Sequence, residues 1–160
     1  MRFKQWLETA QIVNLSGESF DFDDEEGDRD TLIQQAWALA KQSPINILSN
    51  KDLNSAAVIN EQVVGVLFIA WNQNEFSFDV IVSPQFQQQG IGKQLIGVAM
   101  SEFRWMSEGI EGAHIKADVV NNFLIPVLQR YGFVIKQQVG GHTIMVKSTP
   151  CTPVRVSIYL

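Results

Sequence analysis

The chain has 160 residues, of which 46% are hydrophobic and 18% are charged, and its formal net charge is −5. A chain of this length and composition can bury a sizeable apolar core, which excludes a disordered protein and predicts a single domain over residues 1–160. The acidic balance, with a pI near 4.9, argues against nucleic-acid binding and suits a cationic amine or a basic peptide as the partner.

The N-terminal part shows helix and strand periodicity on either side of an acidic segment. We predict a short helix over Met1–Thr9, a short strand over Gln11–Leu15, and an amphipathic helix over Thr31–Gln42 that Ser43-Pro44 ends. Residues 21–30 hold seven of the 17 acidic side chains, but the glycine that a calcium loop requires at its sixth position is missing. This segment is interpreted as a solvated loop whose acids favour the start of the next helix, or as a lip that attracts a cationic substrate.

Three apolar segments in the middle of the chain predict consecutive antiparallel strands. Ala56–Ile59 and Gln62–Trp71 are separated by Asn60-Glu61, which is typical of a hairpin, and Glu75–Val82 follows after a polar turn. From Ile91 to about Glu108 the apolar residues recur every three or four positions, which predicts a helix packed on a sheet.

The C-terminal third continues with alternating strand and helix patterns. The predicted elements are a strand over His114–Val120, a short helix over Asn121–Arg130 interrupted by Pro126, a strand over Phe133–Gln137 and a strand over His142–Lys147. The fold class is therefore α/β (α+β), with a central mixed, mostly antiparallel sheet flanked by helices. The tail, residues 149–160, alternates like a strand and pairs either with the edge of this sheet or with a second subunit in a homodimer.

The most informative segment joins a strand to a helix. Residues 82–92 read V-S-P-Q-F-Q-Q-Q-G-I-G. Backbone N–H groups in the first turn of a helix have no intrahelical partner, and the helix dipole adds about half a positive charge there, so an anion is the expected ligand. Gly90 and Gly92 permit positive φ and let a bulky diphosphate approach the main chain. Gln87 turns its amide either toward a phosphate or back onto the loop.

Two nucleotide-binding motifs do not fit this loop. A Walker A loop requires glycine at position 87 and Ser or Thr after Lys93, whereas the chain has Gln87 and Gln94. The dinucleotide fingerprint requires a third glycine where the chain has Leu95. Lys93 is the one charged side chain between positions 80 and 101, so the loop is a non-acidic window in an acidic protein, as a polyanionic cofactor requires.

The segment resembles the acyl-CoA loop of the GCN5-related N-acetyltransferase (GNAT) family, which reads R/Q-x-x-G-x-G/A after a strand ending V-x-P. The matching residues are Val82, Pro84, Gln87, Gly90 and Gly92, without a gap. The resemblance implies a GNAT-like acyl-CoA N-acyltransferase fold, with a best-matching core over residues 56–147. It also implies acetyl-CoA as the co-substrate. Its pantetheine arm would be held by Val80, Ile81 and Val82, and its pyrophosphate by Gln87, Gln88, Gln89, Gly90, Ile91, Gly92 and Lys93.

A second family pattern, N-x-x-A-x-x-x-Y-x-x-x-G-F, is matched in part. Asn121 and Gly132-Phe133 occupy the family positions, so the resemblance adds Asn121 to the cofactor site. The family alanine is Leu124 here, and the family tyrosine, which usually lies near the CoA sulfur and protonates the leaving thiolate, is Leu128. Tyr131 is a candidate for that acid, although three further residues along a helix rotate a side chain by about 300°.

Acetyl transfer to an amine requires a base, because an ammonium with a pKa near 10 is almost fully protonated at neutral pH. Glu75 and Asp79 are the candidates, since residues four apart on a strand share a face and this strand leads into the loop. Asp79 is favoured because burial between apolar neighbours raises the pKa of a carboxyl group. His114 and His142 are alternative bases, and both also suit ordinary surface positions.

The sequence thus predicts an acetyl-CoA-dependent N-acetyltransferase that acts on a primary amine of a small molecule or a protein by direct attack in a ternary complex. The alternative is a catalytically weak acyl-CoA-binding or interaction module, because the family tyrosine is missing at Leu128. No metal is expected, since Cys151 is the single cysteine and the two histidines lack metal-ligand spacing. No apolar run reaches the roughly 18 residues of a membrane span, and the chain turns acidic too soon for a secretory signal, so we expect a cytoplasmic protein without membrane or nucleic-acid partners.

Overall fold

The computed structural model describes residues 10–16, 26–42, 51–87, 89–119 and 122–148. The helix expected over Met1–Thr9, the cofactor-site residues Gln88 and Asn121, and the tail over residues 149–160 lie outside these ranges. None of the described helices combines the length and the apolar character needed to cross a membrane.

Seven strands form one sheet in the order β1-β2-β3-β4-β5-β7-β6. Their bounds are Gln11–Asn14 for β1, Asp52–Ile59 for β2, Gln62–Asn72 for β3, Glu75–Val82 for β4, His114–Val119 for β5, Val134–Val139 for β6 and His142–Ser148 for β7. The β4–β5 pair is parallel, and each of the other neighbouring pairs is antiparallel. The prediction of a mixed, mostly antiparallel sheet is confirmed.

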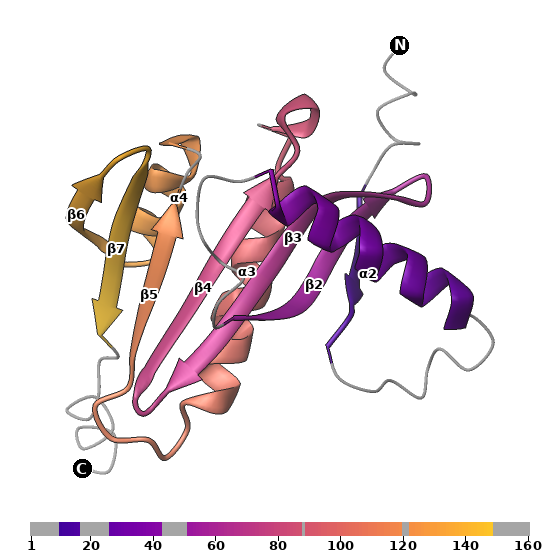
Figure 1. Ribbon diagram of the computed structural model, residues 1–160. Coiled ribbons are helices and arrows are strands. Elements are labelled where there is room, and N and C mark those ends of the chain that lie inside the picture. The colour runs from indigo at the N-terminus through magenta and orange to yellow at the C-terminus, as the bar shows by residue number, and fades with distance from the viewer. Residues whose placement is uncertain (1–9, 17–25, 43–50, 88, 120–121, 149–160) are drawn as a thin grey trace.

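Helices cover both faces of this sheet, with α2 (Glu26–Ala40) in front and α3 (Ile91–Met106) behind in Figure 1. Side chains alternate along β4, so that Phe76, Phe78 and Val80 join the core under α3 while Ile81 joins the core under α2. The short helices η2 (Pro84–Phe86), η3 (Asn122–Leu124) and α4 (Ile125–Arg130) complete the described elements. Strand β4 thus contributes side chains to the core on each face of the sheet.

Three predicted elements differ from the observed ones by more than two residues or in kind. Helix α2 begins at Glu26 and not at Thr31, because acidic residues are favoured in the first turn of a helix and extend it into the acidic segment. Strand β2 begins at Asp52 and not at Ala56, since the polar Asn54 and Ser55 are buried and hydrogen-bond to each other within the strand. Pro126 does not interrupt a helix but lies in the first turn of α4, where proline is well tolerated.

The turns between the central strands follow the predicted hairpins. Asn60 and Glu61 have φ values of 51° and 64°, which matches a two-residue turn with positive φ at both central positions. Gln73 has φ 61° in the turn between β3 and β4. Because both turns are tight, β3 pairs with β4 along the whole of β4, from Glu75 to Val82.

The parallel pairing of β4 with β5 is shorter than either strand. It runs from Glu75 opposite His114 to Asp79 opposite Asp118 and then ends. Residues 80–82 of β4 have no partner on β5, although they still pair with β3 on the other side. The two strands therefore form a fork that opens after Asp79, toward the end of β4 that leads into the glycine loop.

Candidate active site

The glycine loop has the geometry of an anion site at the start of α3. Gly90 is the N-cap residue with φ 85°, and a Cβ at this position would meet nothing within 4 Å. The first turn of α3 contains no acidic residue, and the N–H groups of its first residues have no intrahelical acceptor. Gln94 makes the first helical bond at this end, to the Gly90 carbonyl at 3.0 Å. The open space in front of Gly90 thus faces unpaired donors and the positive end of a helix dipole.

Two other loop residues make contacts within the protein. The Gln87 amide donates to the Val82 carbonyl at 3.3 Å, which ties the loop back to the end of β4. Gly92 is the second residue of α3, and the positive φ expected for it is not observed. A Cβ on Gly92 would come within 2.8 Å of Leu124 Cδ2, so this glycine makes room for the leucine side chain.

Gly65 positions the start of α3 and was missed in the sequence. It lies on β3 opposite Val82, and a Cβ there would stand 3.0 Å from side-chain atoms of both Ile91 and Leu95. The missing side chain lets the first turns of α3 approach the sheet beside the fork. A glycine in the interior of a strand often marks such a close approach, and that signal was available.

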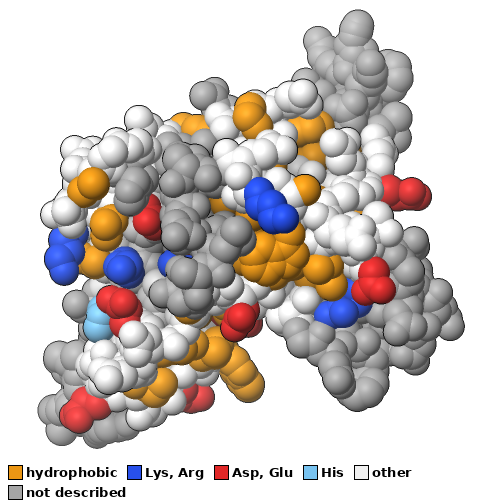
Figure 2. All heavy atoms as spheres, viewed as in Figure 1, with side chains coloured by type: hydrophobic (Ala, Val, Ile, Leu, Met, Phe, Trp, Pro, Cys, Tyr) orange, Lys and Arg blue, Asp and Glu red, His pale blue; other side chains and the backbone are white. Residues whose placement is uncertain are grey.

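We call the paired part of β4 and β5, from Glu75 and His114 to Asp79 and Asp118, the seam. On the face of the sheet that α2 covers, three polar residue pairs follow one another along this seam. Glu75 lies opposite His114, Ser77 opposite Lys116, and Asp79 opposite Asp118, with each pair on the same face because partners in register point the same way. The His114 Nε2 atom lies 3.2 Å from Glu75 Oε2, which is an ion pair when the imidazole is protonated. Figure 2 shows acidic and basic side chains intermingled on this face, over the region of β4, β5 and β7.

Asp79 closes this row at the point where the fork opens. Its side chain is fully buried, and neither carboxylate oxygen accepts a well-formed hydrogen bond from the described residues. The Nζ atom of Lys51 lies 3.3 Å from Oδ2, as an ion pair at the long end of hydrogen-bond distance. Burial raises the pKa of Asp79 from 3.8 to about 6; the Lys51 ammonium opposes this rise, and the Asp118 carboxylate adds to it. The carboxyl group therefore exchanges its proton near neutral pH.

Lys51 and Asp118 are the site residues that sequence reasoning missed. The alternation of His114, Lys116 and Asp118 along β5 was a visible signal, because every second residue of that strand is polar. Lys51 gave no comparable signal, since it reaches Asp79 only through the pairing of β2 with β3 and of β3 with β4.

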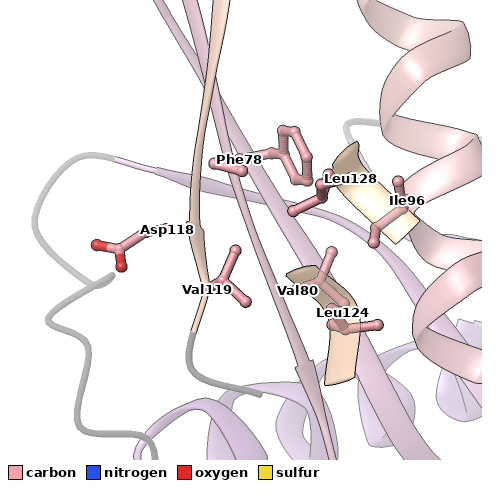
Figure 3. Close-up of a pocket in the computed structure, with 8 residues that line it drawn as sticks. Phe78, Val80, Ile96, Asp118, Val119, Leu124 and Leu128 are labelled. Atoms are coloured by element: carbon pink, nitrogen blue, oxygen red, sulfur yellow. The ribbon is translucent and has the colours of Figure 1, made fainter. Parts of the chain in front are cut away.

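On the α3 side, apolar side chains narrow the fork to a cavity of about 10 Å³, roughly the room that one water molecule needs. Figure 3 shows the side chains of Phe78, Val80, Leu124 and Leu128 converging there, while the Asp118 carboxylate points to the opposite side of β5. The lining residues are Phe78, Val80, Ile96, Ala117, Asp118, Val119, Leu124 and Leu128. Leu128 thus borders the fork, at the position of the family tyrosine.

Tyr131 does not line the cavity beside Leu128. Its hydroxyl is 4.0 Å from the position that a Cβ on Gly97 would occupy, so it packs beside the middle of α3, and it is not among the cavity-lining residues. The structure brings Glu75 and Asp79 onto one face but does not bring Tyr131 to the cavity. Gly132, with φ 101°, ends α4, and Phe133 then packs edge-to-face on Phe78 at 6.3 Å.

Glycine loop and fork together fit a ligand with a diphosphate and an extended arm. The N–H groups without an intrahelical acceptor and the open space at Gly90 suit the diphosphate, and residues 80–82, which have no partner on β5 in the described part of the chain, suit an arm that pairs like a strand. Leu124 and Leu128 are buried beside this path, so an arm that enters the fork must move their side chains.

Comparison with protein families decides the classification. The acetyltransferase (GNAT) domain matches residues 52–135, just over half of the chain, including β2 to β5, the glycine loop and α3. The chain belongs to the GNAT family. The expectation of an N-acetyltransferase is confirmed at the level of this family of enzymes. A search of curated protein sequences gave no significant match.

Solved GNAT structures share the fold at low sequence identity. The chain is similar to Ard1 from Thermoplasma volcanium, with 16% identity, a TM-score of 0.58, and 88% of this chain and 98% of that one covered. It is similar to ElaA from Escherichia coli, with 15% identity, a TM-score of 0.55, and coverage of 88% and 99%. A GNAT family acetyltransferase from Elizabethkingia anophelis, solved with acetyl-CoA bound, gives 17% identity, a TM-score of 0.53, and coverage of 88% and 99%. The GNAT fold is thereby confirmed.

Proposed function

We propose that this GNAT protein is an acetyl-CoA-dependent N-acetyltransferase that acetylates a primary amine of a small molecule or a protein in a ternary complex. One observation carries the proposal. A buried carboxyl group with a pKa near 6 lies where the β4–β5 fork opens, and the fork leads to an open helix N-terminus at Gly90. A base, a path for an extended donor and an anion site thus follow one another along β4 and the loop that joins it to α3.

The donor side of the reaction uses backbone groups. Acetyl-CoA supplies an acetyl group activated as a thioester. Residues 80–82, which lack a β5 partner among the described residues, offer a strand edge for its arm, and the N–H groups at Gly90 and the first turn of α3 receive its pyrophosphate. Gln87 stabilises the loop through its bond to Val82 and adds no charge. The residue types therefore favour a donor recognised through its phosphates and its amide-bearing arm.

The acceptor side lies on the face of the sheet that α2 covers, where the polar row ends at Asp79. In its ionised form Asp79 accepts a proton from the incoming ammonium, which leaves the neutral amine needed for attack. The pKa near 6 keeps Asp79 ionised at neutral pH and still able to hold a proton briefly. Glu75 and Asp118 lie on the same face, where the ammonium groups of Lys51 and Lys116 offset part of their negative charge.

The alternative, a catalytically weak acyl-CoA-binding module, is favoured by one specific observation. Leu128 is buried and borders the fork, so no hydroxyl group stands at the family tyrosine position to protonate the thiolate. Under the first proposal, water must return this proton. Under the alternative, the donor binds and is consumed slowly.

Two measurements on the full chain distinguish these functions. Calorimetry with CoA and acetyl-CoA tests the donor site, and release of free thiol in the presence of a panel of diamines, aminoglycosides and lysine peptides tests turnover. Acceptor-dependent thiol release supports the transferase. Tight CoA binding without turnover on any acceptor supports the binding module, and absence of CoA binding overturns both.

A further inference from the structure

We propose that Lys51 is an acceptor for the protein's own acetyl transfer, so that the chain acetylates one of its own lysines at the fork. This inference rests on the proposed function of the same site. It begins from the contact of Lys51 with Asp79, which places a primary amine beside the carboxyl group assigned as base.

Lys51 has the placement of a bound acceptor. It immediately precedes β2, and its side chain extends over β3 to Asp79, where Nζ lies 3.3 Å from Oδ2. The Lys51 side chain is 13% exposed, so the amine is largely shielded from water. An external amine that uses Asp79 as base must occupy the same space as this Nζ atom.

The donor is expected to end close to this amine. Asp79 is the last paired residue of the seam, and Val80 is the first residue with a free edge toward β5. One residue along a strand corresponds to a rise of about 3.3 Å, so an arm that follows residues 82 to 80 ends about one rise from Asp79. A shift of the flexible lysine stem then brings Nζ to the attack distance of about 3 to 3.5 Å.

The reaction balances with the groups named. Asp79 takes a proton from the Lys51 ammonium, and the neutral Nζ attacks the thioester carbonyl of acetyl-CoA. The new N–C amide bond forms as the C–S bond breaks. The second proton passes from the nitrogen through water to the departing thiolate, so CoA leaves as the thiol, and Asp79 then releases the first proton to solvent; no oxidant or reductant is required.

Other lysines of the described chain provide matched comparisons. Lys116 lies on the same face, opposite Ser77, but it makes no ion pair shorter than 4 Å with Asp79 among the described residues. Lys93 is exposed on α3, at the other end of the fork. Proximity to a base therefore singles out Lys51, whereas simple chemical acetylation would favour the exposed Lys93.

Acetylation would change the site that produces it. It removes the Lys51 charge, which at present opposes the rise in the pKa of Asp79, so that this pKa moves further upward. Because the amide also fills the space beside Asp79, the modified protein should be slower toward external amines. The site would thus be limited by its own product.

The test uses the full chain incubated with acetyl-CoA and no added amine, followed by intact mass and peptide mapping. We expect one acetyl group per chain at Lys51, with a first-order rate constant that is unchanged when the protein is diluted. Asp79→Asn should slow this modification by about a hundredfold or more. Lys51→Arg should abolish it, and Lys116→Arg should leave it intact.

Several outcomes would overturn the proposal. They are acetylation spread over the exposed lysines, an equal rate in heat-unfolded protein, or an unmodified Lys51 in a protein that turns over external amines. The last outcome leaves the proposed function standing, whereas absence of acetyl-CoA binding removes both. The NMR titration of the Asp79 carboxyl group requires no acetyl-CoA, and its midpoint should move to higher pH in Lys51→Met. An unchanged titration would contradict the contact on which the inference depends.

Discussion

Asp79 on β4 and Asp118 on β5 lie directly opposite each other, as the last pair before the two strands separate. Two carboxylates at this spacing repel one another, so their placement is costly for the fold unless a cation or a proton is shared between them. Lys51 supplies one such cation, at 3.3 Å from Asp79. The pair therefore marks the point at which the sheet is adapted to chemistry.

The pH dependence of turnover should report Asp79. Since this group acts as a base when ionised, kcat should rise through pH about 6 and then level off, apart from any limb due to the acceptor amine. Asp79→Asn should lower kcat by about a hundredfold or more and remove the limb near pH 6. Glu75→Gln is the matched control, because it removes a carboxylate from the same face but not from the fork, and it should retain the limb.

The pH dependence of stability should show the opposite trend. The pKa of Asp79 is raised above its ordinary value of 3.8, so its stabilising contribution is fully present below pH 3.8 and is lost as the pH rises through about 6. The loss amounts to about 3 kcal/mol at most, from about two pKa units. Urea unfolding of the wild type and Asp79→Asn at pH 4 to 7 measures it. From pH 4 to pH 7, the free energy of unfolding of Asp79→Asn should rise relative to that of the wild type. A constant difference would show that Asp79 does not titrate abnormally.

The helix N-terminus at Gly90 can be tested with an isosteric pair. Asparagine and aspartate both tolerate positive φ and differ in charge, and the space at Gly90 is open within 4 Å. Gly90→Asp should abolish CoA binding through repulsion of the diphosphate, while Gly90→Asn should weaken it far less. Calorimetry measures both affinities, and thermal unfolding checks that both variants fold alike. Equal affinities would place the diphosphate elsewhere.

Leu128 offers a test of thiolate protonation. Leu128→Tyr restores a hydroxyl at the fork, and Leu128→Phe has nearly the same volume without it, so both carry a similar overpacking cost of about 1 to 3 kcal/mol. If proton return limits turnover, thiol release should be faster in the tyrosine variant than in the phenylalanine variant. Tyr131→Phe is the companion measurement, and the position of its hydroxyl beside Gly97 predicts little change. A large loss in that variant would restore Tyr131 as the acid.

Much of the fold was predictable because its signals are local. The turn at Asn60-Glu61, the strand over Glu75–Val82 and the amphipathic helix from Ile91 each follow from short-range periodicity and turn chemistry. The start of β2 was missed because Asn54 and Ser55 satisfy each other inside the sheet, which cannot be seen in a hydrophobic pattern. Burial can outweigh polarity wherever the partner is also buried.

The residues of the site likewise divide into those that local sequence predicted and those whose roles depend on how the strands pair. Gly90 and Asp79 lie on one continuous segment, so the positive φ of Gly90 and the burial of Asp79 were predictable from neighbouring residues, while their roles in the reaction stay predictions. Lys51 immediately precedes β2 and Gly65 lies on β3, so their roles depend on the register of β2 with β3 and of β3 with β4. Gly92 was assigned to the ligand, but the volume that it leaves free is filled by Leu124. Such contacts follow from packing between elements and not from residue type.

The brevity of the β4–β5 seam has a mechanical consequence. Strands β1 to β4 and β5 to β7 are two antiparallel ribbons, joined within the sheet only along Glu75–Asp79 and His114–Asp118 in the described part of the chain. A donor arm lying along residues 80–82 would lengthen that joint and bridge both ribbons. We therefore expect the two ribbons of the free protein to twist relative to each other about the seam. Binding of the donor should restrict this motion, and its release should restore it.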